Sequence, residues 1–184
     1  NYDTEFQNPF PLDWSPELAR VLANLLGDGS IHVNKEENVV DIRYHNTNKR
    51  LINRFVGDIE SLFNVRPGVS ERHGREEHHR NKYQVQLPGA LGRVVYEILT
   101  LISEDGCPYL PTELEPVFVG ALFDDEGHIS VERKAFISNK DHDLLAGVEG
   151  MLSHHDIDSK LARGQHKLHI RGRENLETFL DVVP

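Results

Sequence analysis

Two acid-glycine pairs occupy matching places in two similar stretches of the 184-residue chain. Asp28-Gly29 follows the apolar run of VLANLLGDGSIHV, residues 21–33, and Glu126-Gly127 follows that of VGALFDDEGHISV, residues 119–131. A carboxylate at such a place can serve as a hard oxygen ligand for a divalent metal ion. Either pair alone would be read as a turn after a helix, because glycine is favoured just past a helix end. The second copy favours a shared chemical role.

Each acid is expected where a helix ends and a hairpin begins. Ser15-Pro16-Glu17 is a helix start that predicts a helix to about Leu26. Residues 30–46 alternate apolar and polar side chains on both sides of a turn, which predicts a hairpin. The same reasoning predicts further helices at 48–63, 89–102, 116–125, 143–152 and 173–183, and further hairpins at 65–87, 128–138 and about 157–171.

These elements give an α+β chain made of two pseudo-symmetric αββαββα halves. Neither half could easily bury the open face of its small sheet alone, so we expect the two to pack as a pseudo-dimer. The expected boundaries are an N-terminal half at 1–102, a Gly- and Pro-rich linker at 103–113 and a C-terminal half at 114–184 that is truncated at its end.

Charge is distributed unevenly along the chain, whose net charge is −10. The four strand segments, counted as 30–46, 65–87, 128–138 and 157–173, hold 14 Lys and Arg against eight Asp and Glu, whereas the remainder holds six against 22, and eight of the eleven histidines also fall in these segments. A basic sheet on an acidic helical back is typical of a protein that lays its sheet on a polyanion. The alternative is that solvated strands simply collect polar residues.

The nine-residue stretches VLANLLGDG and VGALFDDEG resemble the two motifs of a single-chain LAGLIDADG homing endonuclease, and the resemblance covers nearly the whole chain. It implies that the motif helices pack at a central interface, that the antiparallel sheets form a DNA-binding saddle, and that Asp28 and Glu126 are catalytic metal ligands. Gly27 and Asp125 would add backbone carbonyls. The implied cofactor is Mg²⁺, for which Mn²⁺ can substitute.

A second repeated element follows the first hairpin of each half, as NTNKRLI at 46–52 and NKDHDLL at 139–145. The resemblance implies that Asn46, Asn139 and Lys140 act catalytically near the scissile phosphate, where they order water and offset charge. Thr47 stands where the first half would carry its lysine, which puts equal nicking of both strands in doubt. Helix N-capping is the alternative role for the two asparagines.

Contacts to bases and phosphates are expected from outward-pointing strand positions, since Arg pairs with guanine and Gln with adenine in the major groove. The candidates are Arg43, Arg72, Arg75, Arg80, Lys82, Gln84, Gln86, Arg133, Lys134, Arg163, Gln165, Lys167, His169 and Arg171.

Together these features predict a monomeric, site-specific double-strand DNA endonuclease, and the resemblance implies that it leaves short 3′ overhangs and is encoded in an intron or intein. The alternative is an inactive relative that only binds nucleic acid, as an RNA maturase or a DNA-binding regulator. The single cysteine, Cys107, excludes an internal disulfide. No apolar run approaches the ~18 residues that cross a membrane, and no signal peptide precedes the first helix, so we expect a cytoplasmic protein with no membrane partner.

Overall fold

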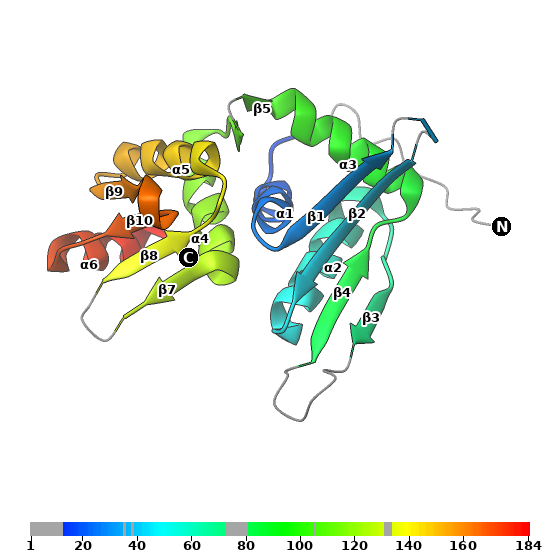
Figure 1. Ribbon diagram of the computed structural model, residues 1–184, viewed down its shortest axis with the longest axis horizontal. Helices are drawn as coiled ribbons and strands as arrows, with labels where there is room; N and C mark the ends of the chain where they lie inside the picture. Colours follow the sequence, from blue (N-terminus) through cyan, green and yellow to red (C-terminus); the bar gives the residue numbers. More distant parts are fainter. Residues whose placement is uncertain (1–12, 35, 38, 73–80, 105, 131–133) are drawn as a thin grey trace. The chain divides into compact units, whose positions relative to one another are not determined.

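The computed structural model describes residues 13–34, 36–37, 39–72, 81–104, 106–130 and 134–184 (Figure 1). It divides into two compact units, Asn1–Ile98 and Leu99–Pro184. None of the described helices has the length and hydropathy needed to cross a bilayer.

The N-terminal unit contains one four-stranded antiparallel sheet and the helices that cover one of its faces (Figure 1). The helix at Pro16–Leu26 is capped by Ser15, whose side chain accepts a hydrogen bond from the Leu18 N–H at 3.2 Å. The strands lie in the order β1-β2-β4-β3. The elements are α1 Pro16–Leu26, β1 Gly29–Asn34, β2 Val39–Asn46, α2 Lys49–Phe63, β3 Val69–Arg72, β4 Lys82–Gln86 and α3 Gly89–Ile102.

The C-terminal unit repeats this arrangement, with its strands in the order β7-β8-β10-β9. A two-stranded pair, β5 Ser103–Glu104 and β6 Cys107–Pro108, and a 3₁₀ turn, η1 Thr112–Leu114, precede it within the segment expected as a linker. The remaining elements are α4 Glu115–Glu126, β7 Gly127–Ile129, β8 Ala135–Ser138, α5 His142–His154, β9 Ser159–Ala162, η2 Arg163–Gln165, β10 Lys167–Ile170 and α6 Arg173–Val182. The predicted αββαββα order is therefore confirmed in both halves.

One detail of the second half differs from the prediction. The hairpin expected at about 157–171 is interrupted by the 3₁₀ turn η2, after which His166 adopts a left-handed conformation with φ of 51°. Arg163 and Gln165 consequently lie on a turn at the end of the sheet and not on a strand.

Each sheet has an apolar face against the helices and a polar face opposite. In the first sheet Ile42, Tyr44 and Val85 are fully buried, and Ile31 pairs with Ile42 but is 38% exposed, because β1 is an edge strand. In the second sheet the corresponding buried positions are Ala135, Ile137, Leu168 and Ile170. Strand alternation then places the polar side chains together on the opposite faces.

A buried ion pair fixes α1 on α2. The guanidinium of Arg20 donates to both carboxylate oxygens of Asp58, from Nε to Oδ2 at 2.9 Å and from Nη2 to Oδ1 at 2.7 Å. Asp58 is only 6% exposed, and its carboxylate raises the pKa of Arg20. This two-bond contact sets how α1 lies on the unit, and therefore where its C-terminal end delivers Asp28.

Candidate metal and nucleic-acid site

The N-terminal unit holds Asp28 just beyond the end of α1. The N–H of Gly27 donates to Ala23 O at 2.8 Å and closes the helix. The backbone carbonyl of Asp28 accepts from the His45 N–H at 3.2 Å, which ties the residue to β2. Its carboxylate Oδ2 accepts a 3.0 Å hydrogen bond from Asn46 Nδ2. Asn46, chosen from the sequence as a catalytic residue, is thus brought directly to the acid.

The surroundings of Asp28 suit a cation. Burial raises the pKa of this carboxyl group, and the positive charge of Lys82 partly offsets that rise. The C-terminal end of a helix is the negative end of its dipole, so a carboxylate placed just past it is favourable only with positive charge nearby. The oxygen donors of Asp28 and of the adjacent carbonyls fit a hard divalent ion.

The glycine after each acid is required by a close backbone approach. A Cβ on Gly29 would lie 2.0 Å from Leu25 O, and a Cβ on Gly127 would lie 2.3 Å from Phe123 O. In both units the chain therefore turns back against the carbonyl of the residue four positions earlier. No other residue type fits there without moving the backbone, which explains why each acid is followed by glycine.

Glu126 occupies the equivalent place in the C-terminal unit. It is the last residue of α4, and Asp125 precedes it within the helix, whereas Gly27 and Asp28 lie just past the end of α1. Among the described residues no group of three or more His, Cys, Asp or Glu side chains could hold a metal ion. A metal bound here would therefore need further ligands, such as backbone carbonyls, waters or phosphates.

The two Asn-containing segments after β2 and β8 adopt the same local structure. Asn46 Oδ1 accepts from the Asn48 N–H at 2.7 Å, and Asn139 Oδ1 accepts from the Asp141 N–H at 2.9 Å. Asn48 and Asp141 in turn cap the following helices. The N-capping alternative for Asn46 and Asn139 is therefore wrong, because the cap is the residue two positions later.

The polar face of the first sheet carries several of the predicted DNA-binding residues. Arg43 and Gln86 are register partners, and both bond to the carboxylate of Asp41, with Arg43 Nε at 3.1 Å and Gln86 Nε2 at 3.1 Å. Lys82 is exposed. Gln84 shares this face but is only 6% exposed, so its outward position does not make it accessible.

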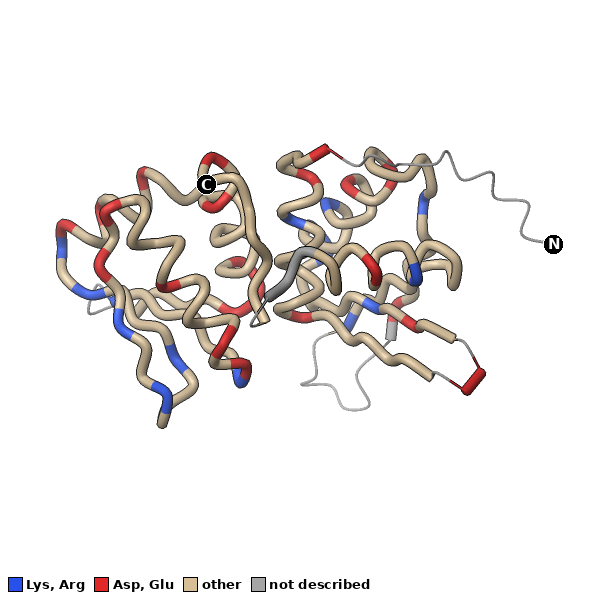
Figure 2. Tube along the Cα trace, turned by 90° about the horizontal axis from the view of Figure 1, so that it is seen from above, with Lys and Arg blue, Asp and Glu red and all other residues tan. Residues whose placement is uncertain are grey.

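The polar face of the second sheet is electrostatically positive. The pKa of His169 is lowered by burial first and then by the charges of Arg171, Lys167 and Lys134. Figure 2 shows Lys and Arg following the β9-η2-β10 ribbon, where Arg163 and Gln165 are also exposed. Such clustering of positive charge is what a phosphate backbone would neutralise.

Phe136 is a residue on this face that the sequence did not indicate. The ammonium of Lys167 lies 4.1 Å from its ring centroid, and the rings of His128 and His169 lie 5.1 and 5.9 Å away. A half-buried aromatic ring among cationic side chains offers an apolar contact beside phosphate-binding groups. The sequence signal for this residue was its place between Ala135 and Ile137, because strand alternation directs Phe136 to the face opposite these two buried side chains.

Some of the predicted DNA-binding residues lie outside the described part of the chain. These are Arg75, Arg80 and Arg133, together with the side chain of Arg72, whose backbone pairs with Lys82. Their contacts remain predictions.

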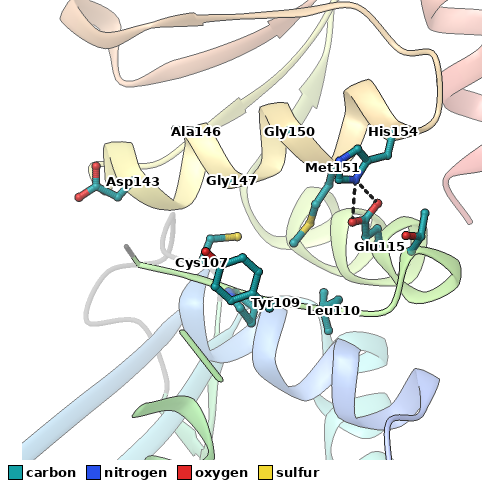
Figure 3. Close-up of a pocket in the computed structure, with 12 residues that line it drawn as sticks. Cys107, Tyr109, Leu110, Glu115, Asp143, Ala146, Gly147, Gly150, Met151 and His154 are labelled. Atoms are coloured by element: carbon teal, nitrogen blue, oxygen red, sulfur yellow. Dashed lines mark hydrogen bonds and ion pairs between the residues drawn. The ribbon is translucent and has the colours of Figure 1, made fainter. Parts of the chain in front are cut away.

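A pocket of about 420 Å³ in the C-terminal unit is a second candidate site (Figure 3). Cys107 lines it, packed against Gly147, and the buried Glu115 lies on its wall with His154 Nδ1 at 2.9 Å. Burial, followed by the charges of Asp141 and Glu115, raises the pKa of the Cys107 thiol to about 12. The thiol is therefore protonated at neutral pH and is not a nucleophile.

Comparisons with known proteins agree with this geometry. Residues 113–184 match the family model described as a LAGLIDADG-like domain. The fold is similar to that of the homing endonuclease I-DmoI in complex with DNA and Mn, with a TM-score of 0.68, 18% identity, and 91% of this chain and 96% of that chain covered. I-DmoI in complex with DNA and Ca gives a TM-score of 0.67 at 19% identity, with 91% and 88% covered.

The fold is also similar to that of full-length DUF199/WhiA from Thermatoga maritima, with a TM-score of 0.64 and 16% identity. This match covers 93% of the present chain and 56% of that one. The comparison with curated proteins gave no match. The resemblance to LAGLIDADG proteins and the fold of two repeated halves are thereby confirmed.

Proposed function

The chain has the two-half LAGLIDADG fold, and from this premise we propose that it is a monomeric, site-specific endonuclease that cuts double-stranded DNA with a divalent metal ion. The observation that carries the proposal is the repeated acid. Asp28 lies just past the end of α1 and Glu126 is the last residue of α4, and each is followed by a glycine that no larger residue could replace without backbone movement. Repetition of such a constrained carboxylate is expected if each half serves one DNA strand.

In this proposal the two acids hold the metal. Asp28 and Glu126 would supply carboxylate oxygens, and Gly27 and Asp125 would supply backbone carbonyls, to Mg²⁺ or, in its place, Mn²⁺. In each half, a divalent ion held by the acid, the backbone carbonyl and the phosphate would activate a water and stabilise the leaving 3′ oxygen. The Asn46 amide donates to Asp28 Oδ2 and so holds the carboxylate in one orientation.

Lys140, another predicted catalytic residue, would contact the DNA. Lys140 follows the Asn139 turn and is exposed, so its ammonium can offset the charge of a phosphate. The positive face around His169 and the Arg43 and Gln86 pair would hold the duplex, which the enzyme would cut to leave short 3′ overhangs. We place the protein in the cytoplasm and its gene in an intron or intein.

A binding-only role is the second candidate function. The observation that favours it is Thr47, which stands where the second half has Lys140 and therefore leaves the two halves unequal. A fold shared with both I-DmoI and WhiA does not by itself decide between cutting and binding.

Supercoiled plasmids carrying intron-less or intein-less insertion sites provide the test. We expect linear product with Mg²⁺ and none with EDTA, and mapping of the ends would give the target. The double variant D28N/E126Q, purified in the same way, is the matched control for a contaminating nuclease and should bind without cutting. Tight binding with no cut by the wild-type protein would refute the endonuclease and support the binding-only role.

A further inference from the structure

The repeated Asn turns align Thr47 with Lys140. Asn46 and Asn139 bond in the same way to the N–H two residues on, so the residue between, Thr47 in one half and Lys140 in the other, occupies the same structural place. Only the second half has a lysine there.

Each Asn turn lies beside a neighbouring segment of its sheet. In the first sheet Asn46 pairs with Tyr83, so the row just past the end of β2 places position 82 across from position 47. In the second sheet the Asn139 N–H donates to His166 O at 3.1 Å, and the residue before His166 is Gln165, which lies on the turn η2.

Each half therefore has one lysine here, on a different segment. The first half has Thr47 at the Asn turn and Lys82 on β4, and the second half has Lys140 at the Asn turn and Gln165 on η2. We propose that Lys82 supplies, from β4, the phosphate-facing ammonium that Thr47 cannot supply in the N-terminal half. The inference rests on the proposed function, because the phosphate it addresses is the one cut beside Asp28.

A lysine on the neighbouring strand can reach the same place. Adjacent strands lie ~4.8 Å apart, and a Lys side chain extends by about that distance or slightly more on its four-carbon stem. Lys82 points to the same sheet face as Gln84 and His45, and His45 is tied to the backbone of Asp28. Lys82 is exposed, and its charge acts on Asp28.

The other lysine near Thr47 is engaged elsewhere. The ammonium of Lys49, at the start of α2, lies 5.7 Å from the centroid of the Tyr83 ring. Alternation along β4 directs Tyr83 to the face opposite Lys82. In the second half Gln165, on the turn η2, has its Oε1 3.3 Å from His169 Nε2 and carries no charge.

Strand-specific nicking tests the proposal. On a mapped target, K82M should slow the cut in one strand about 100-fold and give nicked circles. The variant T47K/K82M should restore linear product, which a merely structural role for Lys82 would not allow. K49M is the matched control and should cut both strands as the wild type does. Linear product from K82M at the wild-type rate, or loss of one cut in K49M instead, would overturn the proposal.

A second readout does not need cleavage. Ethylation interference on bound DNA in the presence of Ca²⁺ should show that K82M loses contact with one phosphate and that T47K/K82M regains it. The slope of log affinity against log salt should fall by about 0.9 in K82M and return in the double variant. An unchanged interference pattern would overturn the role of Lys82. Absence of cleavage by every protein, with these phosphate results as expected, would refute the endonuclease while keeping the Lys82 contact.

Discussion

Replacing Gly29 by alanine should displace Asp28 from its hydrogen-bond partner. The new Cβ would lie 2.0 Å from Leu25 O, 2.5 Å from Leu25 Cα and 2.6 Å from Leu25 C, all of them backbone atoms. Relief to an ordinary contact of ~3.4 Å requires a movement of about 1.4 Å between α1 and β1. Asp28 lies between these two elements, so its 3.0 Å bond to Asn46 Nδ2 would open beyond hydrogen-bonding distance.

Overpacking of this kind costs about 1–3 kcal/mol, which in a chain of this size lowers Tm by roughly 2–4 °C per kcal/mol. A misplacement of about 1 Å should also slow cleavage ~100-fold. Urea unfolding and plasmid cleavage measure the two effects. G57A and G150A are matched controls, because nothing lies within 4 Å of a Cβ at either helical site. Both should be neutral or more stable by up to about 1 kcal/mol. Wild-type stability and activity in G29A would refute the close-approach explanation.

Two further predictions concern stability. D58A should lower the free energy of unfolding by about 3–5 kcal/mol, because it leaves the guanidinium of Arg20 partly buried without its bidentate partner. The control R20M/D58L removes both charges and should lose much less stability. Similar losses of stability for both variants in urea titrations would count against this explanation. The Cys107 thiol has a pKa of about 12 when folded and about 9 when unfolded, so the folded state binds more protons between these values and stability should fall as pH rises from 9 to 12; C107A should flatten that slope in thermal unfolding, and an unchanged slope would contradict the buried thiol.

The sequence was sufficient to predict the order of elements and the repeated acids. Helical periodicity and strand alternation are local signals, and the two copies reinforced each other, so αββαββα was predictable in both halves. The resemblance implied separate roles for Asp28 and Asn46, and the structure adds a 3.0 Å hydrogen bond between them that the sequence did not predict.

Features that depend on contacts between neighbouring strands could not be predicted from the sequence of a single segment. Gln84 has an outward position by alternation, yet it is buried on the inner strand β4, where it pairs with His45 on one side and Ser70 on the other. The place of Lys82 across from Thr47 likewise requires the β2-β4 register. That register joins strands separated in the chain by helix α2 and strand β3, and sequence alternation fixes the face of a strand but not its partner.

The most direct test of the central claim compares the two single-acid variants on the mapped target. If each acid serves one strand, D28N and E126Q should both lose linear product and give nicked circles cut in opposite strands, with DNA affinity unchanged. Linear product from either variant at the wild-type rate would contradict the assignment of Asp28 and Glu126 as the metal-holding acids.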